Sequence, residues 1–335
     1  MSEFDKGDKK KKNIGILWTI LRILIGCGLI ILLFIKLDAE KILSNLKNMR
    51  MIYLFLALIP YLLFIIVSTW RWQVLLEYRK INIRFKDSLI IYFIALFFNN
   101  FLPTTVGGDV MRVFYTMKNN KTDAIAVVIA DRMLGFIGLF IFGLFAVLYL
   151  YLMQKRSEFL PLMVIGLILL TLLTSLLFSE RAYSLLQPVL AHLKVFGLGE
   201  KINNLHRTMT EFGSAYKVIF ICLLQSIIIQ ALLAFSPFLV LRSMGNFQVS
   251  ILPFFIYLPI INVISMLPIS FNALGVRENA YVLLFSRAGL NGETSLTVSL
   301  VSFFLAFLWS LLGGIFFIFY RKPPTSENLK KKGGI

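Results

Sequence analysis

Six long runs of apolar residues dominate this sequence and restrict it to a membrane fold. They cover residues 14–35, 51–70, 123–153, 159–178, 218–241 and 296–320. A transmembrane helix needs about 20 mostly apolar residues, because the hydrocarbon core of a bilayer is about 30 Å thick. The chain is 58% hydrophobic, and a soluble domain would disperse such residues. The sequence therefore predicts an all-α, multi-pass membrane protein with about 6–8 transmembrane helices.

Two further apolar stretches are interrupted by similar polar sequences, at residues 99–112 and 266–279. Each contains Leu-Pro, a hydroxyl residue, glycine, a carboxylate and an arginine that lies nine residues after the proline, at Arg112 and Arg277. Helix breakers and charges at membrane depth are costly, so they usually mark a substrate path. We therefore expect two broken or re-entrant helical hairpins.

Basic residues predict the orientation of the chain. The tail over residues 1–13 holds the run Lys9–Lys12, and the tail over residues 321–335 is also basic. The positive-inside rule places both termini in the cytoplasm and the protein in the cell membrane. Residues 14–320 then form one transmembrane domain. If each hairpin arm instead crossed fully, there would be roughly eight to ten crossings, and hydropathy does not separate the two topologies.

The order of the segments also predicts an internal repeat. In the re-entrant topology, residues 14–152 and 159–320 each contain two spans, one broken hairpin and one span. Three crossings per half would invert the second half relative to the first. Inverted repeats with discontinuous helices are a recurrent design of transporters.

The first interruption has the pattern of an anion site. Gly107 and Gly108 allow a tight turn and close backbone approach, and Asp109 is a suitable N-cap for a following helix. The free N–H groups at such a helix start attract phosphate, and Arg112 can clamp the same anion. The alternative is a capped helix with a local Asp109–Arg112 ion pair.

A charged pair, Asp131 and Arg132, lies about nine residues into the span that begins near residue 123, where charge is expensive. Adjacent helical residues point about 100° apart, so each needs a partner elsewhere. We expect Arg112 or Arg277 for Asp131, and Asp109 or Glu278 for Arg132. The alternative is a structural ion pair that holds the bundle together. Three other arginines near helix ends are expected to snorkel to the interface: Arg22, Arg71 and Arg242.

The second interruption places Arg277 and Glu278 after a flexible break at Asn272 and Gly275. An anion could again meet an arginine at a helix start. Neutral polar side chains are expected to line the same cavity: Asn99, Asn100, Thr104, Thr105, Ser270 and Asn272. Singly, such residues often only bridge helices, so the interpretation depends on the whole set.

The sequence gives little support to nucleic-acid binding or to a metal or cofactor site. The net charge of +17 comes from basic residues at the ends of apolar segments, so we expect no nucleic-acid binding. Cys27 and Cys222 show no metal or disulfide spacing, and His192 and His206 are fourteen residues apart rather than four. We expect no metal and no cofactor.

Taken in order, these motifs resemble the lysylphosphatidylglycerol synthase transmembrane-region family, a flippase-like domain. The resemblance covers about residues 15–320. It depends on residues 100–112, on Asp131-Arg132 with Gly135, and on Pro268, residues 274–278 and Gly289. Thr104-Thr105 stand where a glycine is common, and Asp131 where glutamate is common. Full-length relatives carry a soluble aminoacyltransferase domain that is missing here, so we expect no lysyl transfer by this chain alone.

Three functional hypotheses follow. The first is a translocase for an anionic lipid, such as phosphatidylglycerol, lysyl-phosphatidylglycerol or a polyprenyl-phosphate carrier. Arg112 and Arg277 would bind the phosphate. Asp109, Asp131 and Glu278 would balance these arginines, or engage a cationic headgroup or a coupling proton. The second is the membrane part of a phosphatidylglycerol lysyltransferase or other lipid-headgroup transferase. The third is a non-catalytic scaffold for a separate lipid-modifying enzyme.

Overall fold

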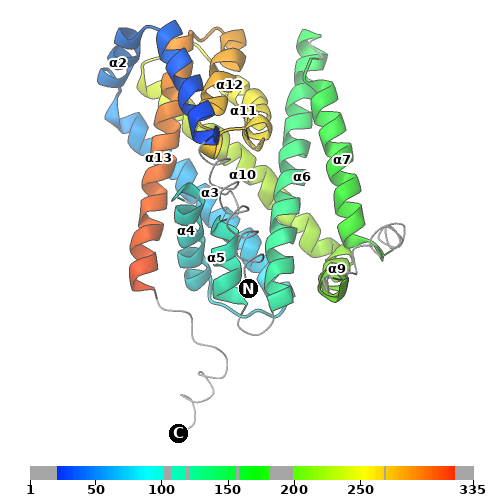
Figure 1. The fold of residues 1–335 in the computed structure, drawn as a ribbon. Helices are drawn as coiled ribbons and strands as arrows, with labels where there is room; N and C mark the ends of the chain where they lie inside the picture. The colour runs from blue at the N-terminus through cyan, green and yellow to red at the C-terminus, as the bar shows by residue number, and fades with distance from the viewer. Residues whose placement is uncertain are drawn as a thin grey trace, which may run out of the picture. The chain divides into compact units, whose positions relative to one another are not determined.

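The computed structural model describes residues 21–101, 107–117, 121–155, 158–180, 199–267 and 269–320 (Figure 1). Within these ranges the secondary structure is helical, beginning with a helix over residues 21–36. The elements that follow it are α2 (Ala39–Lys47), α3 (Met51–Tyr78), α4 (Phe85–Phe101), α5 (Gly107–Thr116), α6 (Lys121–Gln154), α7 (Leu160–Phe178), α9 (Gly199–Gly213), α10 (Tyr216–Ser243), α11 (Leu252–Ser265), η2 (Phe271–Ala273), α12 (Val276–Phe285), η3 (Ser286–Ala288) and α13 (Gly292–Phe319).

Four of these helices are long and apolar enough to cross a membrane: α3, α6, α10 and α13. They have 28, 34, 28 and 28 residues. Their positions confirm the spans expected near residues 51, 123, 218 and 296. Shorter apolar helices accompany them, among them α11, and α7 coincides with the span expected at 159–178. The protein is thus an all-helical membrane protein, as predicted.

Both interrupted stretches form a longer helix followed by a helix of ten residues. In the first, α4 has 17 residues and α5 has 10. In the second, α11 has 14 residues and α12 has 10, with the short helix η2 between them. Ten helical residues are about 15 Å long, about half the thickness of the hydrocarbon core. Neither α5 nor α12 therefore crosses a membrane by itself.

The contacts divide the chain into two compact units. Unit 1 consists of residues 1–59, 100–105 and 234–307. Unit 2 consists of residues 60–99, 106–233 and 308–335. The division falls within continuous helices at residues 59–60, 233–234 and 307–308, so α3, α10 and α13 each contribute residues to both units. The expected pseudo-repeat of residues 14–152 and 159–320 stays a prediction.

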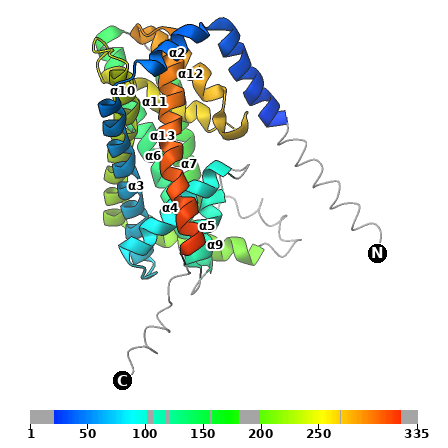
Figure 2. The same cartoon turned by 90° about the vertical axis from the view of Figure 1, so that its left-hand side faces the viewer.

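Unit 1 contains two small groups of packed side chains. Leu33, Ile42 and Leu296 form a buried cluster that holds α2 beside the start of α13 (Figure 2). Helix α2 begins where the Asp38 carboxylate accepts hydrogen bonds from the N–H groups of residues 40 and 41, at 3.0 and 3.3 Å. In the second group the rings of Phe254 and Phe285 join α11 to α12, with centroids 4.6 Å apart.

Unit 2 is held by a larger buried core around Trp72, Leu75, Ile94 and Leu134. Helices α6 and α7 lie side by side (Figure 1). Small residues allow close helix approach, as is usual in membranes. At Gly313 in α13, an added Cβ would collide with the backbone carbonyl of Phe93 in α4.

Helix α9 is amphipathic and packs against the core of unit 2 through its apolar face. Its side chains Met209 and Phe212 are buried in the core, while Glu211 is exposed. Arg79, one residue beyond α3, forms ion pairs with Glu211 and with Asp123 of α6. Burial alone would lower the pKa of Arg79, but the hydrogen bonds to these two carboxylates raise it. Residues 181–198, which precede α9, lie outside the described ranges.

The close contact at Gly313 gives a prediction for stability. We expect Gly313→Ala to lower the free energy of unfolding by about 1–3 kcal/mol, because the new methyl group overpacks the α4–α13 contact. The matched control is Gly28→Ala, because no atom lies within 4 Å of the Cβ that this change would add. Thermal unfolding in detergent measures both. Equal midpoints for the two variants would contradict the packing described here.

Candidate functional site

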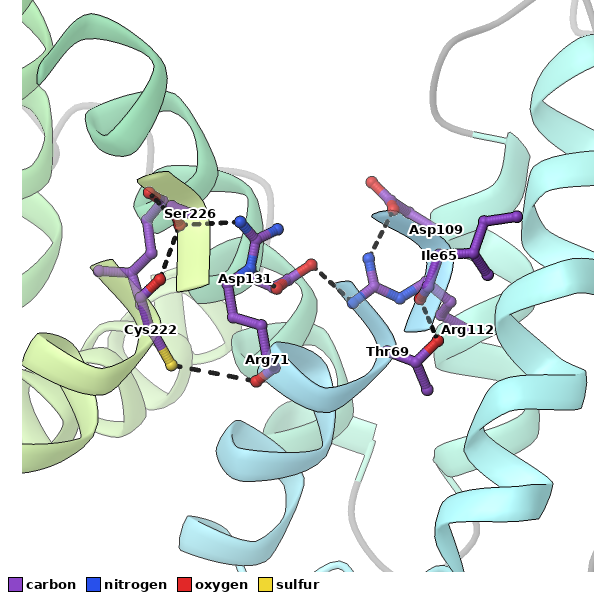
Figure 3. A network of polar contacts seen from close by, with 9 residues as sticks. Ile65, Thr69, Arg71, Asp109, Arg112, Asp131, Cys222 and Ser226 are labelled. Carbon is purple, nitrogen blue, oxygen red and sulfur yellow. Dashed lines mark hydrogen bonds and ion pairs between the residues drawn. The ribbon is translucent and has the colours of Figure 1, made fainter. Parts of the chain in front are cut away.

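Five charged side chains of alternating sign form a continuous cluster inside unit 2, which we call the charge network. Figure 3 shows four of them, Arg71, Asp131, Arg112 and Asp109. Arg71 Nε donates to Asp131 Oδ1 at 2.7 Å, and Arg112 Nη2 donates to Asp131 Oδ2 at 2.8 Å. Arg112 Nη1 lies 3.5 Å from Asp109 Oδ1. Asp109 also forms an ion pair with Arg132. Each carboxylate therefore bridges two arginines.

Three helices supply these side chains. Arg71 comes from α3, Asp109 and Arg112 from α5, and Asp131 and Arg132 from α6. The two α5 residues are three apart, so they lie on one helix face. Asp131 and Arg132 point about 100° apart. As a result the Asp131 side chain is 3% exposed, whereas that of Arg132 is 32% exposed.

The network is buried and carries an excess positive charge. Arg71, Asp109, Arg112 and Asp131 are each between 2% and 8% exposed. Removing charges from water costs several kcal/mol per ion unless they are paired. Here three arginines face two carboxylates. The five side chains together carry a formal charge of +1.

Aromatic rings and a serine fix the arginines. The Arg112 guanidinium lies over the rings of Trp72 and Tyr92, at 4.6 and 5.4 Å from their centroids. Such stacking suits a planar, delocalised cation. Arg71 Nη1 donates to Ser226 Oγ at 2.9 Å, and Ser226 Oγ in turn donates to a backbone carbonyl in α10 at 2.7 Å. Arg71 and Arg112 are therefore held in fixed positions.

A close approach of α4 positions the start of α5. The backbone N–H of Gly108 donates to Asn99 Oδ1 at 2.8 Å. An added Cβ at Gly108 would collide with the carbonyl of Ala95. Glycine is needed here because it lets the two backbones meet. Gly107, the other glycine of the motif, is buried as the first residue of α5.

Two expected pairings within this site are confirmed, because Asp131 binds Arg112 and Arg132 binds Asp109. The local contact between Asp109 and Arg112, which was the alternative interpretation, is also present. Two other expectations were wrong. Asp109 is the third residue of α5, so it pairs with arginines rather than acting as the N-cap. Arg71 is buried in the network rather than snorkelling, because α3 continues for seven residues beyond it, to Tyr78.

A groove between α5 and α6 adjoins the charge network. Its volume is about 520 Å³. One end is formed by Asp109 and Arg132, and Lys121 lies at the start of α6. The remaining lining is apolar: Val110, Val113, Phe114, Met117, Ile125, Val128 and Ile129.

The second interruption forms a separate polar cluster in unit 1. Glu278 is fully buried and accepts from the N–H of Gly275 at 2.6 Å. The guanidinium of Arg277 donates to Glu278 at 3.0 and 2.5 Å and lies 4.3 Å from the ring centroid of Phe303. Ser299 Oγ donates to the same carboxylate at 3.4 Å. Within this cluster, one arginine balances one carboxylate.

Neutral residues named from the sequence have different surroundings. Asn272 Nδ2 donates to Asn100 Oδ1 at 3.4 Å, which joins the end of α4 to the break before α12. Asn272 and Gly275 have φ values of 49° and 78°, so the break is a left-handed turn. Ser270 is buried, and its Oγ has no hydrogen-bond partner among the described residues. Thr104 and Thr105 lie outside the described ranges.

In the two interrupted stretches the acidic residue, not the arginine, has the same position in the helix that follows the break. Asp109 is the third residue of α5, and Glu278 is the third residue of α12. Carboxylates in a first turn complement the positive end of the helix dipole. By contrast, Arg112 is the sixth residue of its helix and Arg277 the second. Equal spacing from the prolines therefore does not give equal positions.

The chemistry available at these sites is the binding of charge. Across the ranges that the structure describes, no three His, Cys, Asp or Glu side chains are grouped so that they would hold a metal ion. Arginines held by carboxylates and rings offer fixed N–H donors to phosphate or carboxylate groups.

Comparison with known proteins agrees with this architecture. Residues 19–314 match the family described as the lysylphosphatidylglycerol synthase TM region. The chain belongs to this family. It is 23% identical over 334 residues to the UPF0104 membrane protein PH1989 of Pyrococcus horikoshii, which covers 92% of this chain and 99% of that protein. It is also 30% identical over 128 residues to the UPF0104 membrane protein MJ1595 of Methanocaldococcus jannaschii, which covers 36% of this chain and 38% of that protein.

In this family member, Asp131 is expected to be the residue of the network whose loss costs most stability. Asp131→Asn removes the charge that two buried arginines share, so we expect the free energy of unfolding to fall by about 3–5 kcal/mol. Asp38→Asn is the matched control, since asparagine is an equally good N-cap at the exposed start of α2. Thermal unfolding of both variants in detergent checks this. A midpoint for Asp131→Asn equal to that of the control would refute the role given to the shared carboxylate.

Proposed function

We propose that this protein is a membrane translocase for an anionic, phosphate-bearing lipid, and that the charge network binds the headgroup. Phosphatidylglycerol, its lysyl form and polyprenyl-phosphate carriers have the required chemistry. The observation that carries the proposal is a buried chain of three arginines and two carboxylates, in which Arg132 also lines a groove. An arginine with fixed N–H donors binds phosphate oxygens in a bidentate manner.

The depth of the network supports a role in translocation. Arg132 lies eleven residues after Lys121, the first residue of α6, which is about 16 Å along a helix. If α6 enters the membrane near Lys121, Arg132 is close to the middle of a core about 30 Å thick. Charges at that depth are rare and usually belong to a substrate or ion path. A phosphate crossing the membrane needs a counter-charge there.

The proposed topology follows from the two ten-residue helices. We infer that α4 with α5, and α11 with α12, are re-entrant hairpins, because α5 and α12 are each about 15 Å long. The halves 14–152 and 159–320 would then be inverted repeats, a frequent arrangement in transporters with broken helices. Basic residues in both tails favour cytoplasmic termini.

The description of the family gives indirect support to an anionic phospholipid as the substrate. It names the transmembrane region of a lysylphosphatidylglycerol synthase, so an anionic glycerophospholipid or its aminoacylated form is a natural substrate to propose. A separate lipid-modifying enzyme that supplies the substrate is the corresponding partner. The names of the two archaeal relatives state only that they are membrane proteins.

A reconstituted transport assay tests the proposal. Purified protein in liposomes should move fluorescent phosphatidylglycerol, its lysyl form or a short-chain polyprenyl phosphate between leaflets. Arg132→Gln should slow this movement at least about tenfold, because a charge-assisted hydrogen bond is worth about 1.5–3 kcal/mol. Arg84→Gln is the matched control, since its side chain is 81% exposed outside the network.

Two outcomes would contradict the translocase. Headgroup transfer by the purified protein, without lipid movement, would favour a membrane-embedded transferase. No movement of any of the three lipids by folded wild-type protein would favour a scaffold for a separate enzyme. Movement that is unchanged in Arg132→Gln would reject the charge network as the headgroup site.

A further inference from the structure

The groove between α5 and α6 has a mostly apolar lining that suits a hydrocarbon chain. Seven of its ten lining residues are apolar. Val110 and Phe114 on α5 are 59% and 45% exposed, so this wall is accessible from the side. Ile125, Val128 and Ile129 form the facing wall on α6. Both helices belong to unit 2, so the groove is a feature of one compact body.

The charges of the groove are placed unevenly along it. Arg132 and Asp109 meet at the end where α5 begins, and Lys121 stands at the start of α6. Two of the three charged lining residues are basic. Asp109 already shares its carboxylate with Arg112 of the charge network. Arg132 is therefore the basic residue placed to meet an anionic group, and the apolar walls between it and Lys121 complement a hydrocarbon chain.

We propose that this groove binds one hydrocarbon chain of a membrane lipid while Arg132 binds the phosphate of the same molecule. The inference rests on the proposed function and adds where the lipid sits. From the phosphate at Arg132, the chain runs between α5 and α6 toward Met117 and Lys121. Lys121 lines the groove with its aliphatic stem, and its ammonium group reaches the headgroup layer.

The size of the groove fits one chain. A volume of about 520 Å³ falls in the range of pockets for single small ligands, about 300–1,000 Å³. Its length along α6, from Lys121 to Arg132, is about 16 Å. The second chain of a diacyl lipid would stay in the bilayer. A lipid with a single chain is therefore expected to occupy the groove as well as a diacyl lipid does.

The phosphate, not the chain, supplies the selectivity of this site. Lipid tails are as apolar as valine or leucine, so a chain gains little by moving from the bilayer into an apolar groove. A phosphate at Arg132 gains a charge-assisted hydrogen bond at a depth where water is scarce. Occupancy should therefore depend on the phosphate, and the apolar walls should decide only where the chain lies.

Photolabelling with a single-chain probe tests this. The probe is a dodecyl phosphate with a diazirine in its chain, used on the full-length protein in dodecyl maltoside, which contains no phosphate. The control probe is the corresponding alcohol. Mass spectrometry locates the labelled residues. The phosphate probe should label the facing walls of α5 and α6 more strongly than the exposed face of α7 around Leu169, and the alcohol should not.

Three variants sharpen the result. Arg132→Gln should reduce the excess labelling of the groove at least about tenfold, which corresponds to about 1.4 kcal/mol. Val113→Trp should remove it by filling the groove. Leu169→Trp is the matched control for added bulk, because Leu169 is 61% exposed on α7 and does not line the groove. It should keep the labelling of the wild-type protein.

The failures are distinguishable. Equal labelling by the phosphate and the alcohol, or no excess in the groove over α7, would overturn the chain site even if lipid translocation and its loss in Arg132→Gln are both observed. Groove labelling that depends on phosphate and Arg132 would support the site even if the wild-type protein moves no lipid, and the translocase would then be the part that fails. If thermal unfolding shows that Val113→Trp is folded and its groove is still labelled as in the wild-type protein, the chain site is also overturned.

Discussion

The arrangement of unit 2 depends on one carboxylate shared between two arginines. Asp131 on α6 holds Arg71 of α3 and Arg112 of α5 at 2.7 and 2.8 Å. A buried charge is tolerable only when its partners are held in place, and rings and a serine hold both arginines here. A helix of ten residues such as α5 is too short to be stable by itself. It is fixed by these ion pairs and by the close contact of Gly108 with α4.

The two interrupted stretches show that similar sequence motifs can have different electrostatic surroundings. The cluster in unit 1 pairs Arg277 with its neighbour Glu278, and the acid also closes the start of α12 through Gly275. It is neutral within itself, and its residues serve to fix a left-handed turn. The network in unit 2 instead shares two acids among three arginines that come from three helices.

The sequence predicted the helical membrane class and much of the network, but not its complete membership. Apolar runs located the long helices because length and hydropathy suffice for that purpose. The pairs Asp131–Arg112 and Arg132–Asp109 were among the expected partners, because charges at membrane depth must find one another. Arg71 was expected at a helix end because the apolar run stops at residue 70, whereas polar residues extend α3 to Tyr78. The position of Asp109 within α5 depends on where a helix begins, which a run of glycines leaves open. The groove depends on how α5 packs against α6, and no local pattern reports that.

Native mass spectrometry of the purified protein tests the central claim most directly, namely that the charge network is a binding site for a phosphate-bearing lipid. The wild-type protein and Arg84→Gln would be incubated with phosphatidylglycerol and, separately, with a diacylglycerol of the same chains, beside Arg132→Gln. The account predicts that wild type and Arg84→Gln retain phosphatidylglycerol in preference to diacylglycerol, and that Arg132→Gln loses this preference. Equal retention of the two lipids by the wild-type protein, or an unchanged preference in Arg132→Gln, would contradict it.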